Sequence, residues 1–179
     1  LVAVVAQENQ QQLRTLPQAD VCLDFSHPQM LAELSAYIQR TGTPLCCGTT
    51  GFSSGQKSEL ERLGAFAPVL YSANYSYGIA LLGKILRMFS AEILEAFDIE
   101  IIEKHHSQKA DAPSGTANFL AQALDPAGTL RHVSGRAGFV GARKKDEMGM
   151  FALRGGTVAG EHEVFLFGED ETLSFSHAA

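Results

Sequence analysis

The chain has 179 residues and a mass of 19.2 kDa, enough for one large domain or two small ones with hydrophobic cores. Apolar residues make up 45% and charged residues 19%, a composition typical of globular proteins rather than disordered chains. The 14 basic and 20 acidic side chains give a net charge of −6. This charge disfavours nucleic-acid binding, which depends on a basic surface that neutralises phosphates.

The sequence also argues against membrane insertion and secretion. The longest apolar candidate, residues 78–97, is interrupted by four charged side chains. The first residues, LVAVVAQENQQQ, lack the basic region and the cleavage site of a signal peptide. Cys22, Cys46 and Cys47 follow no metal-binding spacing, and their odd number indicates a reducing, cytoplasmic compartment.

Strands and helices alternate in the first part of the chain. Continuous apolar runs predict four strands, at Leu1 to Ala6, Val21 to Phe25, Pro44 to Cys47 and Pro68 to Tyr71. Apolar residues at helical spacing predict a helix that starts near Pro28 and ends at Gly42, and another over Ser54 to Leu63. The alternation predicts βαβ units and a parallel sheet.

The pattern changes near residue 76, where we place a domain boundary. A long, largely buried helix is predicted over Gly78 to Phe97. Beyond it, we expect a strand at Ile99 to Glu103 and a helix at Ser114 to Leu124. Short strands separated by glycine-rich turns follow, near Val133 and over Phe151 to Leu153, Val164 to Phe167 and Leu173 to Ser176. Residues 77–179 are therefore predicted to form an α+β domain with an open mixed or antiparallel sheet.

A dinucleotide-binding βαβ unit carries a G-x-G-x-x-G loop after its first strand, and this sequence has no such motif. If Leu1 to Ala6 is the second strand of such a unit, roughly 30 residues with that loop would precede it. We therefore expect residues 1–76 to form an incomplete Rossmann-like domain without its first strand and glycine loop.

The stretch HHSQKADAPSGTA, residues 105–117, concentrates residues that do chemistry. Two histidines end a predicted strand, Lys109 follows, and Ser114-Gly115-Thr116 opens a helix. A helix start binds carboxylates or phosphates through its unpaired N–H groups and partial positive charge. A histidine beside it can give or take a proton near neutral pH. These residues predict an anionic substrate with acid catalysis next to it.

Simpler interpretations of the same residues stay open on physical grounds. A histidine pair is often a surface feature, and Ser-Gly-Thr is an ordinary helix cap. Adjacent histidines can also bind zinc, but no Cys, His or carboxylate stands at a recognised spacing, and Glu161-His162-Glu163 is not an H-E-x-x-H motif. We therefore predict no metal.

Residues 103–117 resemble the E-x-H-H-x-x-K-x-D-A-P-S-G-T-A signature of the dihydrodipicolinate (4-hydroxy-tetrahydrodipicolinate) reductase family. Four further segments agree in order, at residues 23–26, 48–52, 72–76 and 154–162. The resemblance implies NADH- or NADPH-dependent reduction of 4-hydroxy-tetrahydrodipicolinate in the diaminopimelate route to lysine. It also implies a homotetramer formed through the sheet of the second domain.

The resemblance assigns roles to individual positions. His105 matches the general acid/base, with Lys109 donating or stabilising a proton. The implied contacts to the substrate are made by His106, Lys109, Ser114, Gly115 and Thr116. The implied contacts to the cofactor are made by Phe25, Gly48, Thr49, Thr50, Ser72, Ala73, Asn74 and Tyr75. Tyr75 stands where the family usually has phenylalanine. Glu8 is the candidate for a ribose contact because an acidic residue at the end of the second strand serves that purpose, although it is equally compatible with a solvated loop. With no arginine following it, Glu8 slightly favours NADH.

Two other functions remain open. A relative without the glycine loop could bind a dicarboxylate without catalysing its reduction. Another Rossmann-type enzyme, such as a semialdehyde dehydrogenase, needs a catalytic cysteine that none of the three cysteines is placed to supply.

Overall fold

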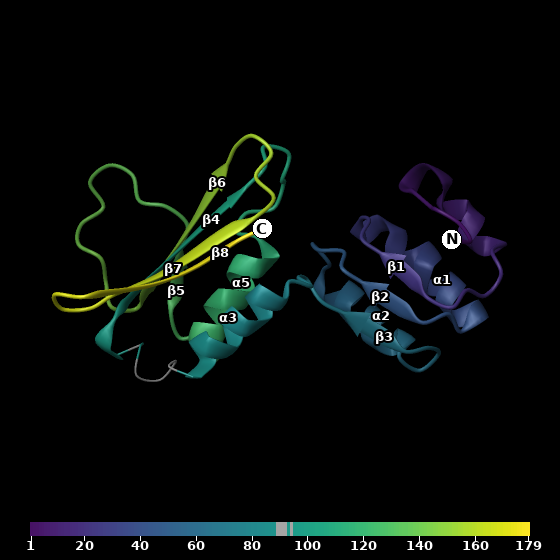
Figure 1. Cartoon of the computed structure of the whole chain (residues 1–179), viewed down its shortest axis with the longest axis horizontal. Coiled ribbons are helices and arrows are strands. Elements are labelled where there is room, and N and C mark those ends of the chain that lie inside the picture. The colour runs from purple at the N-terminus through teal and green to yellow at the C-terminus, as the bar shows by residue number, and fades with distance from the viewer. Residues whose placement is uncertain (89–92, 94) are drawn as a thin grey trace. The chain divides into compact units, whose positions relative to one another are not determined.

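A computed structural model describes residues 1–88, 93 and 95–179. The chain divides into two compact units, Leu1–Tyr75 and Ser76–Ala179 (Figure 1). Each unit has its own hydrophobic core. None of the helices in the described part of the chain is long and apolar enough to cross a membrane.

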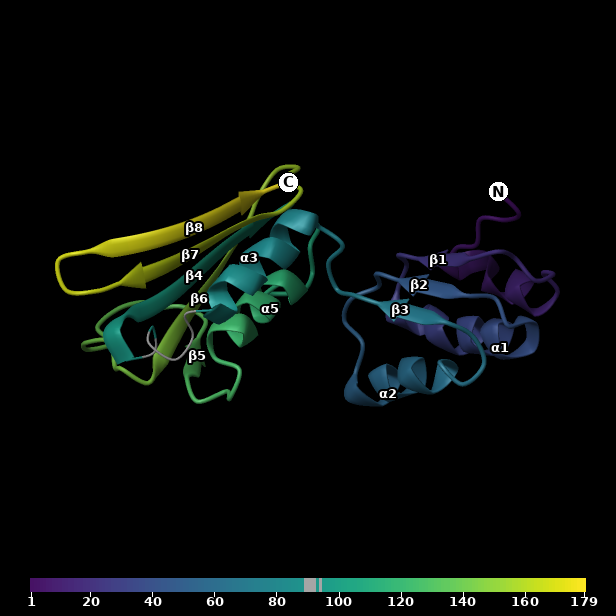
Figure 2. The same ribbon diagram turned by 60° about the horizontal axis from the view of Figure 1, so that its bottom comes forward.

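The N-terminal unit is built on a three-stranded parallel sheet in the order β1-β2-β3. Its strands are β1 (Cys22–Asp24), β2 (Leu45–Cys47) and β3 (Val69–Tyr71). A short 3₁₀ helix, η2 (Pro28–Met30), leads into α1 (Leu31–Thr41), and α2 (Ser54–Leu63) connects β2 to β3. Figure 2 shows both α-helices on one face of this sheet. The predicted alternation and parallel pairing are confirmed.

Local sequence explains where these helices begin and end. The hydroxyl of Ser53 caps α2 by accepting from the Gln56 N–H, and the Gln56 side chain accepts from the Ser53 N–H in return. Helix α1 ends at Gly42, whose φ of 69° is left-handed, the conformation that glycine adopts without steric cost. The predicted ends of these two helices, at Leu63 and Gly42, are confirmed.

The strand predicted at Leu1 to Ala6 is wrong for this structure. Residues 1–6 form no strand, and the 3₁₀ helix η1 (Gln7–Arg14) follows directly. A strand needs an adjacent strand for its N–H and C=O groups, and residues 1–6 pair with no strand of the described sheet, not even with its edge strand β1.

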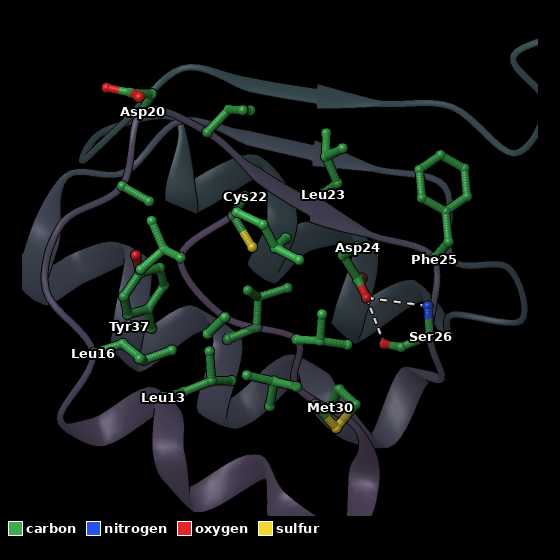
Figure 3. Close-up of a pocket in the computed structure, with 18 residues that line it drawn as sticks. Leu13, Leu16, Asp20, Cys22, Leu23, Asp24, Phe25, Ser26, Met30 and Tyr37 are labelled. Atoms are coloured by element: carbon green, nitrogen blue, oxygen red, sulfur yellow. Dashed lines mark hydrogen bonds between the residues drawn. The ribbon is translucent and has the colours of Figure 1, made fainter.

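A cavity of about 550 Å³ lies between residues 1–5 and β1 (Figure 3). Its walls are mainly apolar, with Leu13, Met30 and Tyr37 lining it beneath β1. Leu23 on β1 and Phe25, which follows the strand, are largely exposed. This cavity holds few ionisable groups, and it is not where the predicted catalytic residues lie.

The C-terminal unit is built on a five-stranded mixed sheet in the order β5-β6-β4-β7-β8. The strands are β4 (Asp98–His105), β5 (Arg131–Val133), β6 (Glu147–Arg154), β7 (Glu161–Phe167) and β8 (Thr172–Ala178). Strands β5, β6 and β4 are parallel, whereas β4, β7 and β8 are antiparallel. The predicted open mixed sheet is therefore confirmed.

Two helices, α3 (Tyr77–Met88) and α5 (Gly115–Leu124), cover one face of this sheet (Figure 2). Alternate residues of β4 point toward them, so Ile99 and Ile101 pack in a core with Leu86, Leu120 and Leu124. The helix predicted over Gly78 to Phe97 is described as α3 up to Met88, and part of its remainder lies outside the described residues.

The basic segment at residues 143–147 is less solvated than its charges suggest. The Arg143 side chain is only 18% exposed, because it donates to the Glu100 carboxylate and to the carbonyl of Ile99. Lys145 pairs with Asp98 at 3.2 Å. Ion pairs and a backbone contact therefore hold Arg143 against β4, although five charged residues in a row are usual for a solvated loop.

Candidate active site

Strand β4 carries the central residues of the candidate site. Because side chains alternate along a strand, Glu103 and His105 lie on the same buried face as Ile99 and Ile101. Lys104 lies on the opposite face, where it pairs with two acidic side chains of β7. The alternation therefore separates the buried histidine from the more exposed lysine beside it.

Glu103 lies at the centre of the site and is 1% exposed. One oxygen, Oε1, accepts from the Ser114 N–H at 3.1 Å and from Arg154 Nη2 at 2.7 Å. The other, Oε2, accepts from Arg154 Nη1 at 3.0 Å and is hydrogen-bonded to His105 Nδ1. The carboxylate is the hydrogen-bond acceptor in all four contacts, which is the behaviour of an ionised carboxylate.

The electrostatics of Glu103 agree with this geometry. Burial acts to raise its pKa, but the hydrogen bonds from Arg154 and His105 outweigh burial and hold the pKa below its usual range. With Glu103 ionised, His105 carries a proton on Nδ1, so Nε2 is the nitrogen available for exchange. A Cβ at Gly160 would lie 3.1 Å from this Nε2, so a larger residue there would crowd the exchanging atom.

His162 on β7 packs beside His105, with ring centroids 5.1 Å apart at 75°. It is 3% exposed, and its Nε2 lies 3.2 Å from the Ser114 hydroxyl. Burial first, and then the nearby His105, lower the pKa of His162 to about 4. His162 is therefore a neutral imidazole near pH 7.

The loop after β4 places Lys109 at the edge of the site. Its ammonium donates to Asp111 Oδ1 at 2.7 Å, and its side chain is 17% exposed. Burial acts to raise the pKa of Asp111, but the hydrogen bond from Lys109 outweighs it and the pKa is lowered. Arg154 Nη2 also donates to the Asp111 carbonyl at 2.7 Å. The arginine that binds Glu103 therefore also fixes the loop that carries Lys109.

Helix α5 begins at this site. The hydroxyl of Ser114 caps it by accepting from the Ala117 N–H at 3.1 Å, and Gly115 and Thr116 form the first turn. The amino end of a helix is a favourable place for a carboxylate, because partial positive charge accumulates there. The structure brings His105, Lys109 and this helix start together around Glu103 and Arg154. His106 follows them, half-buried, at the end of β4.

Glu103, His105 and His162 form the one group among the described residues whose atoms lie close enough together to hold a metal ion. Both carboxylate oxygens of Glu103 are already hydrogen-bonded, two of those bonds come from Arg154, and Arg154 brings a positive charge of its own. A cation would have to displace the guanidinium, so these residues do not fit a resident metal.

The predicted cofactor residues lie in the N-terminal unit, where three parallel strands end. Phe25 follows β1, Gly48 to Thr50 follow β2, and residues 72–75 follow β3. Ligands of open parallel sheets bind at the carboxyl ends of the strands. A Cβ at Gly48 would lie 2.2 Å from the Phe25 ring, so only glycine fits beneath that ring as it is placed.

Buried polar contacts join the ends of β1 and β2. The Asp24 carboxylate accepts from the Thr49 hydroxyl at 2.9 Å and from the Cys47 thiol at 3.1 Å. The Ser26 N–H donates to Asp24 Oδ1 at 3.2 Å and to Thr49 Oγ1 at 2.8 Å, and Figure 3 shows the Asp24–Ser26 pair. The side chain of Thr49 is thus committed to the protein, and Thr49 reaches a ligand only through its backbone.

Two other predicted cofactor residues have informative positions. The Tyr75 hydroxyl lies 3.1 Å from the Cys47 carbonyl and 3.2 Å from the Leu70 carbonyl, so it is anchored to β2 and β3. Burial first, and then the hydrogen bond with Cys46, raise the pKa of Tyr75 to about 12. Glu8 lies exposed in η1 instead of at a strand end, because residues 1–6 form no strand.

Sequence reasoning assigned no role to Glu103, Arg154 or His162. The matching segments included all three, but their function depends on strand pairing. Register places Arg154 opposite His105 and His162 opposite Glu103. The sequence did carry a signal for the contact between Glu103 and His105, because the spacing Glu103-x-His105 at the end of a predicted strand places both side chains on one face.

Two family profiles match the chain. Residues 2–75 match the profile described as dihydrodipicolinate reductase, N-terminus, and residues 78–179 match its C-terminus. A relative named 4-hydroxy-tetrahydrodipicolinate reductase from Exiguobacterium sibiricum is 41% identical over 160 residues, covering 89% of this chain and 64% of the relative. Its namesake from Clostridium novyi is 44% identical, covering 90% of this chain and 64% of that protein. A further namesake, from Exiguobacterium sp., is 38% identical over 183 residues, covering 100% of this chain and 73% of that protein.

A solved structure is similar as well. Dipicolinate-bound dihydrodipicolinate reductase from Paenisporosarcina sp. TG-14 aligns with a TM-score of 0.59 and 25% identity, covering 89% of this chain and 62% of that one. The chain spans about 64% of the length of several of the relatives that it matches. The two profiles together match residues 2–75 and 78–179, so this chain belongs to the dihydrodipicolinate reductase family.

Proposed function

We propose that this protein acts in the reduction of 4-hydroxy-tetrahydrodipicolinate to tetrahydrodipicolinate by NADH or NADPH and one proton, with release of the 4-hydroxyl group as water, in the diaminopimelate route to lysine. Family membership and the shared name of the relatives support the reaction. The observation that carries the proposal is the buried Glu103–His105 pair beside Lys109 and the start of α5. This arrangement joins a proton-transfer group to an anion-binding surface.

The substrate of this reaction carries two carboxylates, which suits the charges of the site. Lys109 and the amino end of α5 attract one carboxylate, with Ser114, Gly115 and Thr116 around it. The half-buried His106 is the proposed contact to the other end of the substrate. A relative solved with dipicolinate, a planar dicarboxylate, supports this class of ligand.

His105 is the proposed acid. Hydride addition to an unsaturated ring leaves carbanion character, which must be quenched by a proton. Glu103 holds the Nδ1 proton of His105, so its Nε2 gives the proton and is recharged from solvent. The ionised Glu103 stabilises the imidazolium before transfer, as a carboxylate does for a catalytic histidine elsewhere. Lys109 stabilises negative charge on the substrate as the proton is delivered.

The nicotinamide would supply the hydride when bound. Gly48, Thr49 and Thr50 are the proposed contacts at the end of β2, with residues 72–75 and Phe25 at the neighbouring strand ends. The residues at the end of β2 suit a nicotinamide, since Gly48 has no side chain and the Thr49 hydroxyl is turned inward to Asp24. The described residues contain no G-x-G-x-x-G loop for the pyrophosphate.

We further propose that residues 1–76 bind the dinucleotide, that residues 77–179 bind substrate, and that four copies assemble through the second sheet in the cytoplasm. One face of that sheet is left uncovered by α3 and α5. Phe165 and Phe167 stack on this face with their ring centroids 5.8 Å apart, and Phe167 is more than 40% exposed. Exposed apolar surface of this kind is typical of self-association.

The test is consumption of NADH and NADPH, with substrate generated in situ by the preceding synthase. Lys109→Met removes the charge proposed to act on substrate, and Lys145→Met removes an exposed charge as a matched control. We expect Lys109→Met to lose turnover by at least about a hundredfold, the scale of lost acid–base or electrostatic assistance. Full activity in Lys109→Met would refute the assignment.

A second candidate is a dicarboxylate-binding protein without catalysis, for which the capped start of α5 beside Lys109 is sufficient. Isothermal titration with dipicolinate and with NADH separates the two functions. Binding of dipicolinate without cofactor binding or turnover would favour the binding protein. Turnover that disappears in Lys109→Met would favour the reductase.

A further inference from the structure

We infer that His162 is a positioning residue that acts, as a neutral imidazole, through Ser114 on the substrate-binding end of α5 and through ring contact on His105. The kinetic effects expected of His162 variants rest on the proposed function. The structural basis of the inference is the position of His162 between two groups of the site. One is the Ser114 hydroxyl, 3.2 Å from Nε2, and the other is the His105 ring.

Strand register accounts for this position. His162 on β7 pairs with Glu103 on β4 and with His177 on β8. Its side chain points to the face that carries α5 and is 3% exposed. A side chain so deeply buried between strands has few alternative rotamers, so its contacts are fixed by the sheet.

The donors and acceptors of Ser114 and His162 identify the tautomer of His162. The Ser114 oxygen already accepts from the Ala117 N–H, which leaves its single proton to donate. Donation from Ser114 to His162 Nε2 leaves one group unpaired, because His162 Nδ1 has no hydrogen-bond partner among the described residues. The opposite assignment would leave both Nδ1 and the Ser114 proton unpaired. These donors and acceptors therefore assign the proton of His162 to Nδ1.

The charges around His162 keep it neutral. His105 on β4, His177 on β8 and Lys109 on the following loop all oppose its protonation, while Glu103 alone favours it. Burial opposes protonation further and is the largest effect. A neutral ring beside His105 lets His105 become an imidazolium without a second positive charge 5.1 Å away.

Two consequences follow for the reaction. A fixed Ser114 hydroxyl fixes the first turn of α5, so loss of the His162 acceptor should weaken carboxylate binding. The ring contact orients His105, so an aromatic replacement should preserve proton transfer. His162 therefore acts on substrate affinity more than on the chemical step, and it does not itself donate a proton to the substrate.

The experiment compares His162→Phe, which keeps a ring and removes the acceptor, with His162→Gln, which keeps a neutral acceptor near Nε2. His132→Gln, at an exposed position on β5, is the matched control. We expect His162→Phe to raise KM roughly five- to tenfold, the effect of one lost hydrogen bond, with kcat within about twofold. His162→Gln should restore KM, and neither variant should alter the pH profile of kcat/KM. An unchanged KM in His162→Phe, or a pH limb that disappears in His162→Gln, would overturn the inference.

A second readout is independent of turnover. The imidazole ¹⁵N spectrum of histidine-labelled protein, assigned by the signal lost in His162→Gln, should give a neutral Nδ1–H tautomer from about pH 5.5 to 8. Titration of His162 in that range would overturn the inference, whatever the kinetic constants of the variants. If the wild type shows no turnover, the proposed reaction fails. The positioning role is then tested by the dissociation constant of dipicolinate in the same variants, with the same rise expected in His162→Phe.

Discussion

Replacement of Glu103 by glutamine should be among the most damaging single changes to the stability of the C-terminal unit. The Arg154 side chain is 19% exposed, and its two Nη atoms bind Glu103 at 3.0 and 2.7 Å. Glutamine has the same shape but no charge, and its NH2 group replaces one of the two oxygens, so it faces one Nη of Arg154 and either the Ser114 N–H or His105 Nδ1. The substitution therefore leaves a buried guanidinium uncompensated and places donors against donors.

The expected magnitude follows from this loss. Removal of one partner of a buried ion pair costs about 3–5 kcal/mol, because the remaining charge stays buried without compensation. Besides the one amide oxygen that the glutamine retains, Arg154 keeps the neutral carbonyls of Leu153 and Asp111, at 2.8 and 2.7 Å, and its Nε has no partner among the described residues. Against a typical total of about 5–15 kcal/mol, such a loss is a large fraction of the stability.

Urea unfolding followed by circular dichroism measures this effect. We expect a lower midpoint with an unchanged slope, which indicates a loss of stability without a change in exposed surface. A double-mutant cycle with Arg154→Met should be strongly non-additive, because the second change removes the orphaned charge. Glu33→Gln breaks the surface pair with Arg14 and serves as a control, with no loss expected beyond experimental error. A loss below about 1 kcal/mol for Glu103→Gln, or simple additivity with Arg154→Met, would refute this account.

Three further predictions concern pH, packing and thiol reactivity. The folded pKa of His162, about 4, lies below its unfolded value of 6.5, so the unfolded state alone binds a proton between these values. Stability should therefore fall by about 3 kcal/mol as pH drops from 6.5 to 4, and pH-dependent unfolding of His162→Gln should lack that slope. Gly83→Ala should destabilise by about 1–3 kcal/mol despite better helix propensity, because its Cβ would lie 2.4 Å from the Phe119 ring. Gly55→Ala in α2 meets nothing closer than 4.0 Å, so its thermal melting temperature should stay level or rise; equal shifts in both variants would contradict the packing argument. Cys47 is fully buried, and burial first, and then the hydrogen bond to Asp24, raise its thiol pKa to about 12. Peptide mapping after alkylation at pH 8 should find Cys47 unmodified in the folded protein, and rapid labelling there would show that this strand end opens.

Local sequence by itself determined most of the secondary structure. The apolar spacing and caps of α1 and α2 set their ends, because glycine at a left-handed φ and a serine–glutamine capping box act within a few residues. The 105–117 segment likewise indicated a helix start beside histidines and a lysine, since those residues are neighbours in the chain. Such features depend on interactions between nearby residues.

Tertiary structure decided the rest. Residues 1–6 have the composition of a strand, but a strand exists only when it pairs with another, and these residues pair with no strand of the described sheet. The buried network around Glu103 depends on Arg154 and His162, which lie more than 45 residues along the chain and reach the site only through the register of β4 with β6 and β7. Periodicity tells which face a side chain occupies, whereas strand pairing tells which side chains meet, and the pairing is set by packing of the whole sheet.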